Sequence, residues 1–227
     1  MPTKPSRVPD SMTGKVYAAL RRDILSCQIG PGQDLSEGEL ATRFKMSKTP
    51  VREALSKLRS EGLIRSFPRR GYQVAPVTFQ DMNELFEVRN MLEGRATELA
   101  SQNISDDGVR QLSNLADVMY DPSEPLSIRR FVQANRDFHE IIASSCGNVR
   151  LQSMVMQVLD ELQRFFHLGA QLRDIGTETN DYHHQIVAAL KARDAALSRN
   201  VMIAHNDASR QGLMAALTQP SRSMLHI

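Results

Sequence analysis

The chain has 227 residues, 24% of them charged and 41% hydrophobic, which is enough for one large domain or two smaller ones. We expect neither a transmembrane helix nor a secretory signal, because no long uncharged hydrophobic run occurs and the first ten residues hold three prolines. Two cysteines cannot build a disulfide framework, which favours a reducing cytoplasm. The lack of a long hydrophobic run also leads us to expect no membrane partner.

The net charge of +2 hides two regions of opposite sign. Residues 1–76 hold 14 basic and 7 acidic side chains, a net of +7, whereas residues 77–227 hold 14 and 19, a net of −5. All six histidines lie in the second region. We therefore expect two domains with different partners, of which the basic one faces a polyanion. The predicted divisions are a tail at 1–11, domains at 12–76 and 77–219, and a tail at 220–227.

Hydrophobic periodicity and turn residues predict three helices and a hairpin in the first domain. The first helix stops at Gly30, the second opens with a capping box at Ser36, and the third begins after Ser47 with Pro50 in its first turn. The second domain shows helical periods without a convincing strand. These periods run over 79–101, 105–118, 125–145, 149–172, 179–192 and 194–217. The expected class is mainly α: a winged helix-turn-helix followed by an antiparallel all-helical bundle.

The third predicted helix carries basic residues near its start, and the hairpin has arginines at its tip. A helix of this kind fits the DNA major groove, and a cationic hairpin can follow the backbone or enter the minor groove. An ordinary solvated helix face is the alternative explanation for the charges alone.

The run Ser47-Lys48-Thr49-Pro50-Val51-Arg52-Glu53-Ala54-Leu55, with Leu40-Ala41-Thr42-Arg43-Phe44 before it and Pro68-Arg69-Arg70-Gly71 after it, resembles the DNA-binding domain of GntR-type bacterial regulators. The resemblance implies that Arg52 reads a guanine and that the hairpin approaches the minor groove. Two departures are Gly38 and Lys48, where relatives commonly have arginine. The predicted DNA-binding residues are Ser47, Lys48, Thr49, Pro50, Arg52, Arg59, Arg69, Arg70 and Gly71.

Polar residues interrupt the hydrophobic stripes of the second domain. Asn135 and His139 share one helix face, and His183 and His205 lie on the inward faces of two further helices. Converging imidazoles with an amide oxygen could hold zinc or another borderline divalent metal. The alternative is that each is a satisfied core histidine. We do not include His184, His167 or His226 in the set.

Leu85-Phe86-Glu87-Val88-Arg89 with Leu92-Glu93, Asn135-x-x-Phe138-His139, His183-x-x-Ile186 and His205 resemble the ligand-sensing FCD domain of the FadR-like branch of these regulators. Six predicted helices suggest its smaller, VanR-like variant. The resemblance implies a divalent metal, zinc or alternatively nickel or manganese, held by Asn135, His139, His183 and His205. Asn135 stands where the family has Asp.

The same resemblance makes Arg89 a candidate for binding an effector carboxylate beside the metal. A surface arginine paired with Glu93 four residues on is the alternative. We therefore expect a homodimeric repressor in the bacterial cytoplasm, associated with the nucleoid, that binds a palindromic operator under the control of a small organic acid. A metal-dependent enzyme fused to a DNA-binding module is the alternative function. Against it, we find no HExxH, P-loop, GxGxxG or nucleophile elbow in the sequence.

Overall fold

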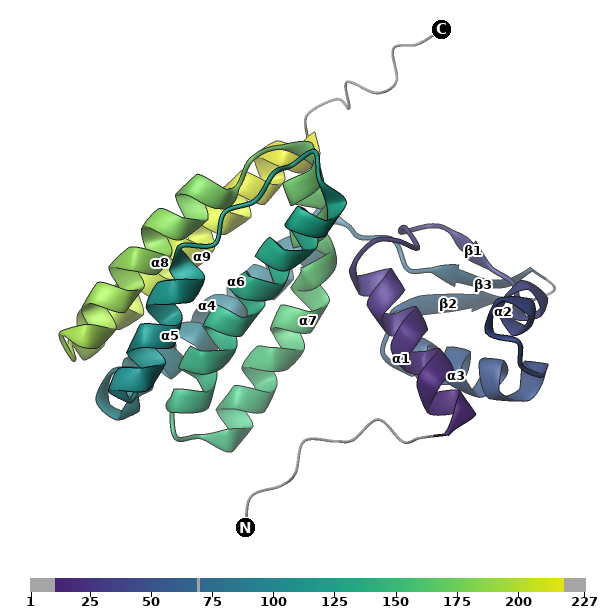
Figure 1. Ribbon diagram of the computed structural model, residues 1–227, viewed down its shortest axis with the longest axis horizontal. Helices are drawn as coiled ribbons and strands as arrows, with labels where there is room; N and C mark the ends of the chain where they lie inside the picture. Colours follow the sequence, from purple (N-terminus) through teal and green to yellow (C-terminus); the bar gives the residue numbers. More distant parts are fainter. Residues whose placement is uncertain (1–10, 69, 219–227) are drawn as a thin grey trace, which may run out of the picture. The chain divides into compact units, whose positions relative to one another are not determined.

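The computed structural model describes residues 11–68 and 70–218, and the chain divides between Val77 and Thr78 into two compact units. Within these ranges the chain forms nine helices and one three-stranded sheet, which confirms the mainly helical class (Figure 1). No helix in the described ranges is long and apolar enough to cross a bilayer.

The first unit is a winged helix-turn-helix. Its elements are α1 (Met12–Leu25), β1 (Asp34–Leu35), α2 (Glu37–Phe44), α3 (Lys48–Ser60), β2 (Ile64–Phe67) and β3 (Gly71–Val74). Ser36 caps α2 as predicted, its hydroxyl accepting from the backbone N–H of Glu39 at 3.5 Å. Lys45 closes the turn into α3 in the left-handed conformation, with φ 54°. One face of each helix packs into a shared core that includes Leu20, Leu55 and Leu58.

Strand β1 was not predicted, and the expected two-stranded hairpin is in fact the larger part of a three-stranded sheet. The strand order is β1-β3-β2 and both pairings are antiparallel. Because β1 has two residues, it is too short to show an alternating pattern. Leu35 lies opposite Tyr72 and joins the segment before α2 to the wing.

The second unit consists, in its described part, of six helices. They are α4 (Phe79–Asn103), α5 (Asp106–Ala116), α6 (Pro125–Ser145), α7 (Val149–Leu172), α8 (Gly176–Lys191) and α9 (Ala195–Thr218). The long helix α4 contacts α6, α7, α8 and α9, so it lines the middle of the bundle. Helix α8 begins three residues earlier than its predicted span, with Ile175 as its N-cap and Gly176 as its first residue.

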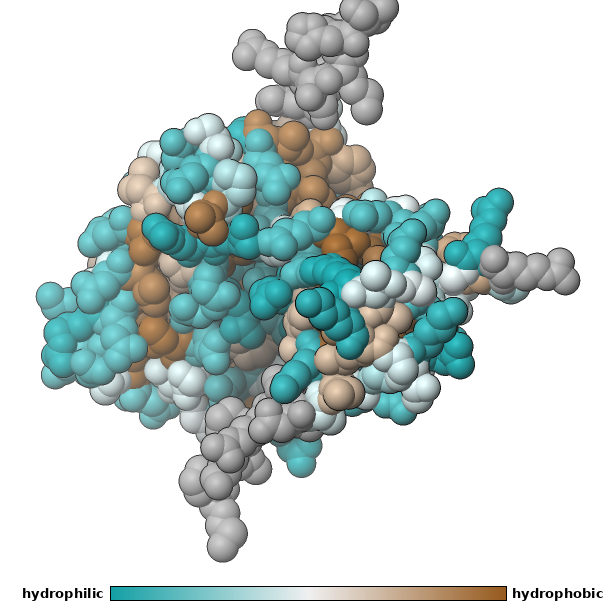
Figure 2. Space-filling model, turned by 45° about the vertical axis from the view of Figure 1, so that its right-hand side comes forward, coloured by the Kyte–Doolittle hydropathy of each residue, from teal (hydrophilic) through white to brown (hydrophobic). Residues whose placement is uncertain are grey.

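The core of this unit contains Phe138 from α6, Ile186 and Leu190 from α8, and Met202 from α9. The surface view in Figure 2 is largely hydrophilic with separate hydrophobic stretches. The unexpected feature lies inside: several buried positions of α4, α6, α8 and α9 are polar or charged. Buried polar groups need partners, so these residues locate the candidate site.

Candidate functional site

Three histidines from three helices meet inside the bundle. His139 of α6, His183 of α8 and His205 of α9 are each at most 2% exposed. Each offers a ring nitrogen, and these nitrogens all lie within 4.8 Å of one another. The inward faces predicted from sequence therefore bring the three imidazoles together.

The three rings are held in the neutral form that ligates metals. Burial lowers the pKa of His139, His183 and His205, and neighbouring positive charge at Arg89 adds to this effect. Both ring nitrogens of His183 and Nδ1 of His205 are buried with no hydrogen-bond partner among the described residues. Unpartnered neutral imidazole nitrogens at this spacing are a donor set that fits a borderline divalent ion.

Glu93 and Arg89 of α4 complete the polar core. Arg89 donates from Nε to Glu93 Oε2 at 2.6 Å, and Glu93 Oε1 lies 2.8 Å from His139 Nδ1. Burial opposes ionisation of Glu93, but the positive charge of Arg89 and the hydrogen bonds from Arg89 and His139 outweigh it and hold the pKa of this carboxyl well below its usual range. The ionised carboxylate then accepts Nδ1–H of His139, which leaves Nε2 as the acceptor nitrogen, 2.9 Å from Arg89 Nη2 and 3.3 Å from His205 Nε2.

Arg89 points inward, at 1% exposure, so the surface alternative for this residue is wrong. Its pairing with Glu93 was foreseen, but the pair is buried, and Glu93 was missed as a site residue. The sequence does indicate that Glu93 lies beside Arg89, because residues four apart on one helix are neighbours. Arg89 Nη2 lies 2.9 Å from His139 Nε2, and Nη1 is buried without a partner in the described structure. This free donor is suited to an anion.

Asn135 is buried one helical turn before His139 on α6, as its place in the hydrophobic stripe predicts. Its role as a fourth metal ligand stays a prediction. His184 is exposed, as expected, and His226 lies outside the described residues. His167 of α7 is buried but is not part of the histidine cluster.

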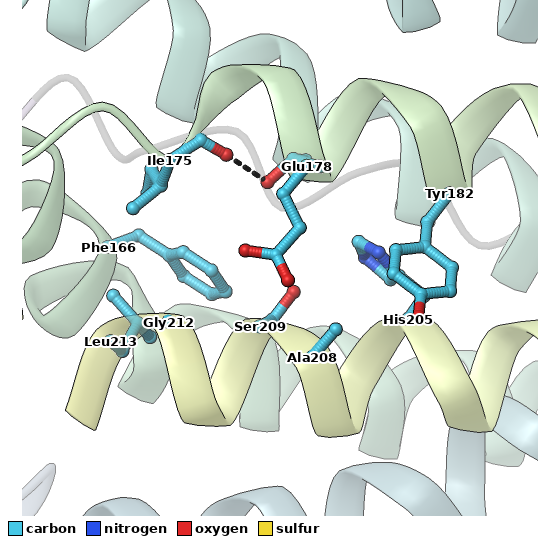
Figure 3. Close-up of a pocket in the computed structure, with 10 residues that line it drawn as sticks. Phe166, Ile175, Glu178, Tyr182, His205, Ala208, Ser209, Gly212 and Leu213 are labelled. Atoms are coloured by element: carbon cyan, nitrogen blue, oxygen red, sulfur yellow. Dashed lines mark hydrogen bonds between the residues drawn. The ribbon is translucent and has the colours of Figure 1, made fainter. Parts of the chain in front are cut away.

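A small pocket lined by residues of α7, α8 and α9 includes His205 of the histidine cluster. Phe166, Ile175 and Leu213 form one side, and His205 lies at the opposite end beside Tyr182 (Figure 3). The carboxylate of Glu178 points across the pocket toward Ser209 of α9. A small molecule in this pocket would therefore contact His205.

The predicted DNA-binding residues lie on the first unit. Ser47, Lys48, Thr49 and Arg52 are exposed at the start of α3, and Pro50 occupies its first turn. The Ser47 side chain makes no capping hydrogen bond, so its hydroxyl and the first N–H groups of α3 are available to a phosphate. Arg59 is exposed near the end of the same helix.

At the wing, Arg70 is exposed and Arg69 lies outside the described residues. Gly71 has φ +92°, and a Cβ there would lie 3.0 Å from the carbonyl oxygen of Leu35. Only glycine adopts this conformation without strain and fits against β1, so Gly71 is required by the wing itself. Its predicted approach to DNA is a separate proposal.

Comparison with known proteins agrees with both halves of this description. Residues 12–74 match the bacterial regulatory proteins of the gntR family, and residues 84–208, more than half of the chain, match the FCD domain. The chain is 26% identical over 194 residues to the uncharacterised HTH-type transcriptional regulator YdhC of Bacillus subtilis, covering 83% of this chain and 85% of that one. It is 26% identical over 198 residues to the HTH-type transcriptional repressor GlaR of Escherichia coli, covering 83% and 90%. The solved structure of E. coli McbR/YncC superposes with a TM-score of 0.77 at 25% identity, covering 92% of this chain and 99% of that one.

The chain belongs to the GntR family of bacterial regulatory proteins and carries an FCD domain. It is a DNA-binding transcriptional regulator, like these relatives, and not an enzyme. The metal-dependent enzyme considered from the sequence is therefore set aside.

His167 predicts a pH dependence of stability. Burial, and then the charge of Arg129, lower its pKa to about 4, whereas an unfolded histidine titrates near 6.5. Below pH 6.5 the unfolded chain binds the extra proton, so stability is lost as pH falls from about 6.5 to about 4. His167→Gln should reduce the slope of the free energy of unfolding against pH by up to about 1.4 kcal/mol per pH unit. The free energy of unfolding, followed by helical circular dichroism with EDTA present, measures it.

His184→Gln, which changes an exposed histidine of the same unit, is the matched control and should leave the slope unaltered. An equal slope for His167→Gln and the unmodified protein would contradict the assignment.

Proposed function

We propose that this protein is a sequence-specific repressor whose operator binding is controlled by a small carboxylate bound beside a divalent metal in the FCD unit. The observation that carries the proposal is the buried cluster of three histidines with unpartnered nitrogens, next to the unpartnered Nη1 of Arg89. A core built only for stability would not leave such atoms unsatisfied, because each costs free energy on burial. GlaR, a relative of similar length, is named a repressor, which supports the direction of control.

In this proposal His139, His183 and His205 hold the metal, with Asn135 as a neutral fourth ligand. Imidazole nitrogens suit zinc, and nickel or manganese are alternatives. The bound ion supplies a Lewis-acidic position for one carboxylate oxygen of the effector. Glu93 orients His139 by accepting its Nδ1–H, and it keeps the net charge of the core low by pairing with Arg89.

The effector's carboxylate is held by Arg89 through the N–H groups of Nη1, while Nε stays with Glu93. The rest of the molecule extends toward the pocket at His205, where Phe166 and Leu213 supply apolar contacts.

The DNA-binding part of the proposal is a homodimer on a palindromic operator. Each α3 enters a major groove, where Arg52 reads a guanine and Ser47, Lys48 and Thr49 contact phosphates. Pro50 sets the first turn of the helix, and Arg59, Arg69, Arg70 and Gly71 contact the flanking backbone and minor groove. We place the protein in the bacterial cytoplasm, on the nucleoid. Effector binding changes operator affinity by favouring one arrangement of the two DNA-binding units.

Arg52→Ala should abolish operator specificity without unfolding the protein, because the side chain is exposed and outside the core. We expect the ratio of specific to non-specific affinity to fall by about 5- to 150-fold, the discrimination of one bidentate contact. Fluorescence anisotropy with a duplex selected from a random library by the unmodified protein measures it. Arg22→Ala removes the same charge from α1 and should change the ratio little; an unaltered ratio for Arg52→Ala would contradict the assignment.

Chelator-treated protein should take up about one zinc ion per chain, measured by equilibrium dialysis and elemental analysis. His183→Ala should lower the zinc affinity by more than about 100-fold, since even outer-shell partners contribute 10- to 100-fold. His184→Ala is the control, because it removes the adjacent but exposed imidazole. Equal zinc affinity in the two variants, both folded by circular dichroism, would remove the metal site from the proposal.

A panel of small mono-, di- and tricarboxylates should contain at least one that raises the melting temperature of the zinc-loaded protein. Arg89→Lys keeps the positive charge but loses the planar fork, so the stabilisation by the same compound should fall sharply. No shift across the panel would count against a carboxylate effector.

A further inference from the structure

The carboxylate of Glu37 lies between the recognition helix and the wing. Glu37 is the first residue of α2, and its Oε1 and Oε2 accept from Arg52 Nε at 3.0 Å and from Arg52 Nη2 at 2.8 Å. The hydroxyl of Tyr72, on strand β3, donates to Oε1 at 3.4 Å. One acidic side chain thus connects α2, α3 and the wing.

The contact occupies one edge of the guanidinium and leaves the other free. A guanidinium has five N–H donors in a planar fork. Glu37 takes the pair at Nε and Nη2, so both hydrogens of Nη1 and the second hydrogen of Nη2 are not bonded to Glu37. Two adjacent N–H groups are what O6 and N7 of a guanine require in the major groove.

Exposure and charge agree with this arrangement. The Arg52 side chain is 64% exposed and that of Glu37 is 21% exposed, so the acid lies on the protein side of the pair. The hydrogen bond from Arg52 lowers the pKa of Glu37, which keeps the carboxylate ionised at neutral pH. An exposed arginine otherwise samples many rotamers, and ordering it on binding opposes complex formation.

We propose that Glu37 is a positioning residue for operator recognition: it fixes the guanidinium plane of Arg52 so that the free edge meets a guanine, and Tyr72 holds Glu37 in place. The inference rests on the proposed role of Arg52 as the base-reading residue. It assigns specificity to an acidic side chain that repels DNA phosphates and would otherwise only weaken binding. It also means that the position of Tyr72 on β3 affects the orientation of Arg52 on α3.

Glu37→Gln tests the proposal against a control on the same helix. Glu39→Gln removes an equal charge from the same first turn of α2, where the side chain is exposed, so both variants change phosphate repulsion and the helix dipole alike. The probe is a duplex selected from a random library by the unmodified protein, with each half-site guanine replaced in turn. Anisotropy gives the affinity ratio between the selected and the replaced duplexes, and circular dichroism checks folding.

We expect Glu37→Gln to reduce the discrimination at one guanine by about 3- to 10-fold, a part of the range for one bidentate contact. Tyr72→Phe should reduce it less, and Glu39→Gln not at all. In an Arg52→Ala background, Glu37→Gln should have no further effect on discrimination. This non-additivity distinguishes positioning from a general effect of charge.

Unchanged or improved discrimination in Glu37→Gln would overturn the proposal, since it would show that the acid only shields Arg52. The experiment distinguishes failure of the base-reading role of Arg52 from failure of the positioning role of Glu37. If Arg52→Ala keeps its discrimination, the role of Arg52 is wrong. If Arg52→Ala loses discrimination but Glu37→Gln keeps it, the positioning role alone is wrong.

Discussion

The ion pair between Arg89 and Glu93 is the constraint around which the FCD unit is organised. Both residues are at most 3% exposed, and removing one partner of a buried pair typically costs about 3–5 kcal/mol. The pair therefore fixes which atoms are available for function. Nε of Arg89 and both oxygens of Glu93 are engaged, and Arg89 Nη2 lies 2.9 Å from His139 Nε2, whereas Nη1 of Arg89 has no partner in the described structure. A ligand can bind to Nη1 of Arg89 without breaking the ion pair.

The two units place their functional charges differently, one in its interior and the other on its surface. The helical unit buries the ion pair of Arg89 and Glu93, and electrostatic interactions are stronger in the interior than in water. The winged unit exposes its charges, and its binding to DNA should depend strongly on salt because phosphate contacts release counterions. The two units share one arrangement, a hydrogen bond from a functional side chain to a glutamate carboxylate. Glu93 accepts from His139 in the helical unit, and Glu37 accepts from Arg52 in the winged unit. In each case an acidic residue lies beside the group proposed to bind the ligand.

Helix spans and inward-facing histidines could be predicted because hydrophobic periodicity is a local property of the chain. The span 125–145 agrees with α6 as observed. Strand β1 could not be predicted, because two residues are too few to show an alternating hydrophobic pattern. Glu93 was seen as a partner of Arg89 but not as buried, since the burial depends on how α4 packs against its neighbours. The contact between Glu37 and Arg52 joins residues 15 apart on different helices, for which no sequence pattern exists.

The most direct test of the account is the coupling between the two units. Operator affinity of the zinc-loaded protein is measured by anisotropy with and without a saturating carboxylate that stabilises the FCD unit. The account predicts a change of at least about 5-fold in the unmodified protein and none in His139→Ala. An operator affinity that is the same with and without the bound carboxylate in the unmodified protein would contradict it.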